Sequence, residues 1–166
     1  MRSMTTVHVG ACLLALVAGA LAAFARKGEF VHIVAGRLYV GATLIYGVSS
    51  FFLYPSTGQF TPFHAISIQN VAMVAVGIAL PRLLKHRVKA WRIWHLRLML
   101  YSYVALVVTG LRFAMPYGPP GNRVLPGLAF MVLPLCSWLW IERRVVPRWR
   151  APPVVVPRGA PYSFDK

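Results

Sequence analysis

The stretch VHVGACLLALVAGALAAFA, residues 7–25, decides the fold class of this chain. Its length matches the ~20 apolar residues that a helix needs to cross the hydrocarbon core of a bilayer. The basic run Arg26-Lys27 and then Gly28 end it. We therefore expect residues 7–25 to form a transmembrane helix.

Four further apolar stretches follow this one, at residues 30–54, 63–81, 91–115 and 124–141. The chain is 58% hydrophobic and only 13% charged, whereas about a quarter of a soluble domain is charged. The sequence predicts an all-α polytopic membrane protein, with a four-helix core bundle and a fifth transmembrane helix, in one domain of residues 1–142. Residues 143–166 are basic and rich in proline, so we expect a cytoplasmic tail without a helix of useful length.

The first apolar stretch ends in Ala-Phe-Ala, a small-x-small pattern that also occurs where signal peptides are cleaved. The apolar run is longer than the core of a typical signal peptide, and Arg2 is the single basic residue before it. We therefore expect residues 1–25 to be retained as a membrane helix.

Positive charge is strongly in excess, with 18 lysines and arginines against 3 acidic residues. The basic residues stand at the ends of apolar runs and not along one soluble face, so the pattern does not favour nucleic-acid binding. Basic connections at 26–29 and 82–92 alternate with the uncharged 55–62 connection. By the positive-inside rule this predicts an outer N-terminus and a cytoplasmic C-terminus, in a membrane that we expect to be the bacterial inner membrane.

Four histidines fall at the ends of the first four apolar stretches. His8 and His64 open the first and third at the outer side, while His32 and His95 lie at the inner ends of the second and fourth. In an up-down bundle with short loops, these are diagonal partners across the core. A haem iron accepts two neutral imidazoles in this way. The sequence therefore predicts two haem b sites, His8 with His64 and His32 with His95.

Two arginines lie near the inner histidines and are candidates to bind haem propionates or lipid phosphates. Arg37 and Arg97 each stand inside an apolar stretch. Arg37 is about 140° around the helix from His32, so a joint role requires the bundle to wrap around the ligand. No carboxylate lies within an apolar stretch, which argues against a carboxylate-based ion pathway.

Other interpretations of these residues stay open. Histidines and arginines near helix ends often lie at the membrane interface without a ligand. His8 and Cys12 are four apart and, with His64, would suit copper or zinc. Ser67 and Asn70 suit either a quinone or plain contacts between helices.

A set of motifs in residues 5–115 resembles a known family. The second stretch contains the pattern H-x-x-x-G-R-x-Y, and the third begins with F-H. The fourth contains W-x-x-H followed by M, S and Y. The matching residues are His32, Gly36, Arg37, Tyr39, Phe63, His64, Trp91 or Trp94, His95, Met99, Ser102 and Tyr103. The chain resembles the bacterial predicted membrane proteins grouped as domain of unknown function 2306. The resemblance implies a helical membrane fold and no established activity. The family often has arginine where this chain has Ile33 and Leu96, so this chain has less positive charge at the inner site.

The arrangement of the histidines is also similar to that of the transmembrane di-haem b-type cytochromes, by analogy and not by sequence. The leading hypothesis is a membrane b-type cytochrome-like redox protein that passes electrons across the bilayer between two bis-histidine haem sites, with a quinone or small reductant at one face. The alternatives are a non-catalytic integral membrane subunit that packs within a larger membrane complex, and a metal-binding or small-solute membrane protein.

Overall fold

The computed structural model describes residues 2–56, 60–88, 90–114 and 124–150. These residues are helical, with short turns and no strand among them, which confirms the predicted all-α fold. The elements in chain order are α1 (Arg2–Phe24), α2 (Phe30–Ser50), the 3-10 helix η1 (Phe51–Ser56), α3 (Pro62–Ala79), the π-helix η2 (Leu80–Leu84), α4 (Trp91–Ala114), α5 (Val124–Trp140), the π-helix η3 (Ile141–Val145) and α6 (Val146–Arg150).

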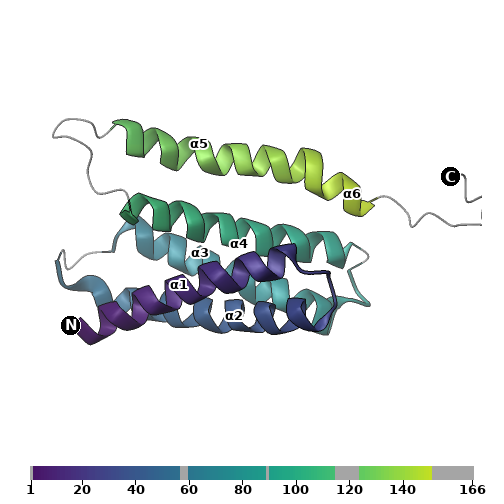
Figure 1. Cartoon of the computed structure of the whole chain (residues 1–166), viewed down its shortest axis with the longest axis horizontal. Coiled ribbons are helices and arrows are strands. Elements are labelled where there is room, and N and C mark those ends of the chain that lie inside the picture. The colour runs from purple at the N-terminus through teal and green to yellow at the C-terminus, as the bar shows by residue number, and fades with distance from the viewer. Residues whose placement is uncertain (1, 57–59, 89, 115–123, 151–166) are drawn as a thin grey trace, which may run out of the picture.

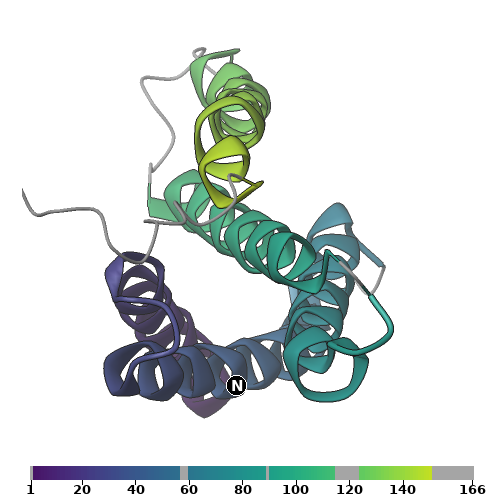
Figure 2. The same cartoon turned by 90° about the vertical axis from the view of Figure 1, so that its right-hand side faces the viewer.

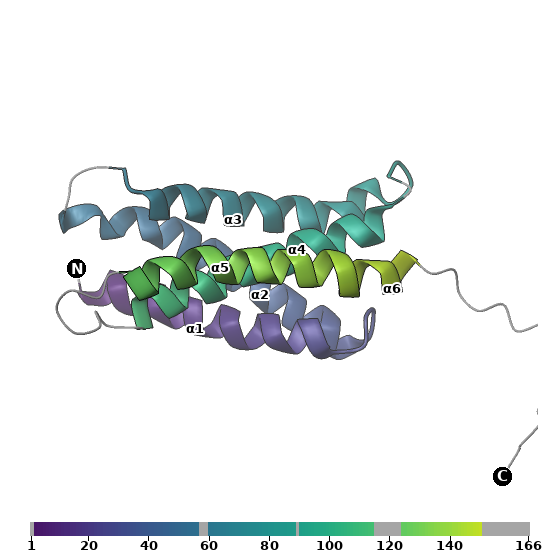
Figure 3. The same cartoon turned by 90° about the horizontal axis from the view of Figure 1, so that it is seen from above.

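Helices α1 to α4 run alternately up and down and form a four-helix bundle (Figure 1). The neighbouring pairs are α1–α2, α2–α3, α3–α4 and α1–α4, as the end view in Figure 2 also shows. Two pairs therefore face each other diagonally across the core, namely α1 with α3 and α2 with α4. Helix α5 lies outside this bundle, along α4 (Figure 3).

Four helices of the described part are long and apolar enough to cross a membrane. They cover Ser3–Phe24, Phe30–Leu53, Pro62–Leu84 and Trp91–Arg112, with 22 to 24 residues each. At 1.5 Å per residue, such helices are about 33 to 36 Å long, which matches a hydrocarbon core of about 30 Å. Large apolar side chains such as Leu13, Val17 and Phe24 are exposed on their surface, as expected for side chains that face lipid.

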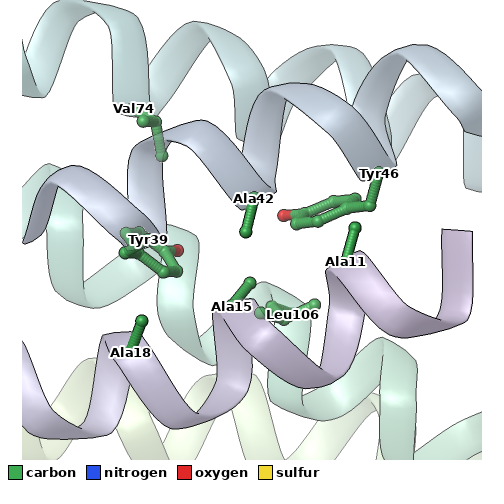
Figure 4. Packing of buried hydrophobic residues seen from close by; sticks show 8 residues of the cluster. All are labelled: Ala11, Ala15, Ala18, Tyr39, Ala42, Tyr46, Val74 and Leu106. Carbon is green, nitrogen blue, oxygen red and sulfur yellow. The ribbon is translucent and has the colours of Figure 1, made fainter. Parts of the chain in front are cut away.

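The core is densest between α1 and α2. Small residues on α1 meet larger ones on α2 (Figure 4), since small residues let two helix backbones approach closely in a membrane. The core cluster consists of Ala11, Ala15, Ala18, Tyr39, Ala42, Tyr46, Val74 and Leu106. The first apolar stretch is thus an integral part of the bundle.

Most of the positive charge lies at one end of the bundle. The turn after α1, the turn after η2 and the η3–α6 segment all lie at this end, opposite the starts of α1 and α3 (Figure 1). The first of these turns contains Gly28 with φ +87°, a left-handed conformation that favours glycine. We call this the basic end, and it carries Arg26, Lys27, Lys85, Arg87, Arg143 and Arg144. The opposite end is the N-terminal end.

The fifth helix continues beyond its predicted end at residue 141. The π-helix η3 and then α6 extend it to Arg150, so residues 143–150 of the predicted tail are helical. Proline is tolerated in the first turn of a helix, and Pro147 is the second residue of α6. The remainder of the predicted tail, residues 151–166, lies outside the described residues.

Candidate functional site

The two inner histidines each anchor one ring nitrogen on a neighbouring helix. The Nδ1 atom of His32 on α2 lies 3.0 Å from the carbonyl oxygen of Ala22 on α1, and Nδ1 of His95 on α4 lies 2.7 Å from that of Gly77 on α3. A carbonyl oxygen can only accept, so each ring carries a proton on Nδ1 and a neutral ring keeps a lone pair on Nε2. Histidines that bind metals are usually anchored in this way, which fixes the tautomer and the ring orientation.

A hydrogen bond across the core sets the depth of these two histidines. The hydroxyl oxygens of Tyr39 on α2 and Ser102 on α4 lie 2.8 Å apart and are buried. His32 and His95 each precede their member of this pair by seven residues, which is two helical turns, about 10 Å along the axis and nearly the same face. Because α2 and α4 run in the same direction, the contact places both histidines at a similar depth in the bundle.

Two cations also reach this end of the bundle. Lys27 Nζ donates to the Ala22 carbonyl at 2.9 Å, so Lys27 and His32 share one acceptor. Although most of the Lys27 side chain is exposed, partial burial lowers the pKa of its ammonium group. Lys27 and Arg82 both lie in the neighbourhood of His95. The sequence analysis did not single out these cations because they lie in or beside the connecting turns, and only the fold brings them to the histidines.

The predicted arginines have different surroundings. Arg97 donates from Nε and Nη2 to the two carboxylate oxygens of Glu142, at 2.8 and 2.5 Å, and its guanidinium lies over the Trp94 ring, 5.1 Å from the centroid. Tyr101 donates to the same carboxylate at 2.5 Å. Arg37 is exposed. A propionate-binding role for either arginine stays a prediction. The sequence analysis missed Glu142 as a partner, because this residue lies just beyond the fifth apolar stretch.

Space lies beside His32 on its own helix face. Gly36 follows His32 by one turn, and a Cβ atom built on Gly36 would meet no heavy atom within 4 Å. Close packing against a neighbouring helix is therefore not the reason for a glycine here. That a flat ring approaches this face stays a prediction.

His8, the first of the outer pair, has a partner on α2. Its Nδ1 lies 3.0 Å from the hydroxyl oxygen of Ser49. Ser49 donates its hydroxyl proton to the Tyr46 carbonyl at 3.1 Å, so its oxygen accepts from His8 Nδ1–H. The Nε2 atom of His8 therefore keeps its lone pair when the ring is neutral, and Cys12 Sγ lies 3.7 Å from it.

His64, the second of the outer pair, has the opposite tautomer. The backbone N–H of Thr61 donates to His64 Nδ1 at 3.0 Å, and the Thr61 hydroxyl lies 2.7 Å from the same atom. This contact caps the start of α3 and makes Nδ1 an acceptor, so a neutral ring carries its proton on Nε2. The ring also lies near Phe51 and Phe60, with centroids 5.5 Å away in each case. As placed, His64 does not offer an Nε2 lone pair to a metal.

The alternative copper or zinc set of His8, Cys12 and His64 does not form a metal site in the structure. Within residues 2–56, 60–88, 90–114 and 124–150, no group of three or more His, Cys, Asp or Glu side chains converges in a way that would hold a metal ion. Cys12 contacts His8, but His64 contacts the cap of its own helix. Of the two predicted pairs, the inner one thus has both rings bonded through Nδ1 to a neighbouring helix, and a shared ligand stays a prediction.

Comparison with known proteins supports the membrane assignment. No curated protein and no solved structure matches this chain significantly. The family described as "Predicted membrane protein (DUF2306)" matches residues 5–141, which includes helices α1 to α5 and both histidine pairs. The chain therefore belongs to the DUF2306 family of predicted membrane proteins.

Proposed function

We propose that this integral membrane protein is a b-type cytochrome-like redox protein that holds a haem between His32 and His95 at the basic end of the bundle. The observation that supports this most directly is the matching pair of Nδ1–H···O=C contacts. The two histidines stand on diagonal helices, and these contacts orient each neutral ring so that the lone pair of its Nε2 atom is available to ligate a metal.

The residues around this pair suit a haem in chemical type. Two neutral imidazoles are the axial ligands of many b-type centres, and the helices offer apolar walls. Gly36 leaves space one turn from His32, and Lys27 and Arg82 bring positive charge near His95, as anionic propionates require. A haem, when bound, supplies reversible one-electron transfer. The protein's own contribution is to fix both ring orientations through the Ala22 and Gly77 carbonyls and to set their common depth through Tyr39 and Ser102.

Electron transfer across the whole bilayer needs the second centre that the sequence predicts, between His8 and His64 at the N-terminal end. His8 has the tautomer that a ligand needs, whereas His64 has to give up the Thr61 cap before its ring offers Nε2. We propose a quinone or small reductant as the redox partner at one face. In this proposal the basic end faces the cytoplasm of a bacterium, so that the inner centre is the cytoplasmic one.

The test is the absorption spectrum of the detergent-solubilised protein from haem-replete cells, oxidised and then reduced with dithionite. We expect a b-type Soret band that is lost from the inner centre in His32→Ala and in His95→Ala. His86→Ala is the matched control, because His86 is an exposed residue of the basic turn, and we expect it to leave the spectrum unchanged. The haem-to-protein ratio, and its change in His64→Ala, decides between one and two centres.

A colourless protein from such cells would overturn the proposal, as would a haem spectrum that both inner variants leave intact. In the first case, a partner that co-purifies stably while the histidine variants still assemble would support the alternative of a non-catalytic subunit within a larger membrane complex. The face open to such a subunit includes exposed apolar side chains of α5, for example Met131, Leu135 and Trp140.

A further inference from the structure

Two polar side chains in the middle of the bundle have atoms without a hydrogen-bond partner. Thr43 on α2 is 0% exposed and Asn70 on α3 is 2% exposed. Among the described residues, neither the Thr43 Oγ1 atom nor the Asn70 Oδ1 atom has a partner. Both lie inside membrane-spanning helices, where lipid cannot supply a hydrogen bond.

The orientation chosen for the Asn70 amide does not remove this problem. Its Nδ2 group donates to the Tyr46 hydroxyl. If the amide is turned over, Oδ1 accepts from the Tyr46 hydroxyl instead and Nδ2 loses its partner. In either orientation, one end of a nearly fully buried amide needs a further hydrogen bond.

Thr43 lies between two phenol groups on one face of α2. Tyr39 precedes it by four residues and Tyr46 follows it by three. Residues three and four apart are neighbours on a helix surface, yet the Thr43 hydroxyl forms no direct hydrogen bond with either phenol. Groups that are near one another but too far apart to bond directly are typically bridged by water.

Leaving these atoms unpaired is energetically unfavourable. A buried polar group without a partner loses the hydrogen bonds that it could form with water outside the protein, and the hydrocarbon core of a bilayer cannot replace them. Buried water typically makes about three hydrogen bonds to such groups. Thr43 offers a donor and an acceptor and Asn70 offers an acceptor, which is a suitable set for water.

We propose that the bundle centre contains a water-binding site formed by Thr43 and Asn70. This site does not depend on the proposed haem. With water in place that also reaches the Tyr39 hydroxyl, the Tyr46–Asn70 pair and the Tyr39–Ser102 pair become one continuous hydrogen-bonded row that joins α2, α3 and α4. The row ends at Ser102, two helical turns from His95.

The first test is the sign of a stability change. Thr43→Val keeps the shape of the side chain and removes the hydroxyl. If the hydroxyl binds water, the variant loses that bond and leaves the Asn70 amide without its water partner. We therefore expect a thermal unfolding midpoint about 3 °C lower in detergent. If the hydroxyl is unsatisfied, its removal raises the midpoint. Thr109→Val, at a half-buried position of α4, is the matched control for the Thr-to-Val change itself. A midpoint that is unchanged or raised relative to this control overturns the proposal.

The second test uses the unaltered protein, so that it does not depend on a variant that folds. Cross-relaxation from water to methyl groups is measured by NMR on methyl-labelled protein in lipid nanodiscs. We expect a signal at the Thr43 methyl and none at the Ala15 methyl, because Ala15 is 0% exposed in the apolar α1–α2 contact. Absence of the Thr43 signal would show that the site is dry and would reject the inference.

Discussion

A neutral imidazole has one nitrogen that donates and one that accepts, and the partners in the fold decide which is which. His32 and His95 donate from Nδ1 to carbonyls of α1 and α3, whereas His64 accepts at Nδ1 from its own helix start. A ring held by a neighbouring helix moves with the bundle and is oriented before a ligand arrives. A ring that caps its own helix is already used for local stability. For this reason we assign the proposed cofactor first to the inner pair.

The hydrogen bond between Tyr39 and Ser102 should be measurable as a coupling between two diagonal helices. We predict that Tyr39→Phe and Ser102→Ala each destabilise the protein. The double variant should lose less free energy of unfolding than the sum of the losses in the two single variants. Membrane hydrogen bonds average about 0.6 kcal/mol and reach about 1.7 kcal/mol in such cycles, so we expect a coupling in this range. Reversible unfolding of the four proteins in mixed micelles measures it. Strictly additive losses would show that the contact does not hold α2 and α4 in register.

The sequence was sufficient to predict which helices lie diagonally across the bundle, but not the orientation of the histidine rings. Polar residues stand out in apolar stretches, and short loops force neighbouring helices to be antiparallel, so the diagonal pairing followed. The acceptors of His32 and His95 are backbone carbonyls of other helices, and backbone carbonyls have no sequence signal. The same reason explains why Lys27 was missed. Its position beside His32 depends on how α1 turns into α2.

At the scale of a single element, α5 is the helix whose attachment depends most on charge. It contacts the bundle through α4, and large side chains along it are exposed. The bidentate Arg97–Glu142 pair and the Tyr101 hydroxyl hold the η3 segment against α4. The two charged side chains are only 17% and 24% exposed, so water screens them less than it screens a surface pair.

We predict that removing one charge of this pair destabilises the protein more than removing both charges. Arg97→Leu leaves a partly buried carboxylate unpaired and Glu142→Leu leaves a guanidinium unpaired, so we expect each to cost about 1–3 kcal/mol. The double variant removes both charges and should lose less than either single one. Unfolding midpoints in detergent give the order. The control is Glu29→Gln, since the Arg26–Glu29 contact is 3.7 Å long with side chains 87% and 60% exposed, and we expect a change within about 0.5 kcal/mol. A double variant with a lower unfolding midpoint than both single variants would contradict this account.

At the scale of the whole molecule, the fold separates the charges along the membrane normal. Connections that are far apart in the sequence, at 25–29 and 85–88, lie at the basic end together with η3 and α6. A bilayer with an anionic cytoplasmic surface favours the orientation that places such an end inside. The same end contains the inner histidines, Lys27 and Arg82. The proposed redox site is thus expected near the cytoplasmic surface, within reach of soluble electron donors.

This orientation predicts which side of the membrane each turn can be labelled from. In a chain whose native Cys12 and Cys136 are replaced by alanine, His86→Cys marks the basic end and Phe60→Cys marks the N-terminal end, both at exposed positions. A maleimide that cannot cross membranes should label the Phe60→Cys variant in intact cells, after the outer membrane has been made permeable. It should label the His86→Cys variant only after the inner membrane is opened as well. The opposite pattern would place the basic end outside, and the haem proposal would then require an electron donor from the periplasm. Because the labelling reads topology without reference to colour or activity, it stays decisive even if the protein proves to bind no haem.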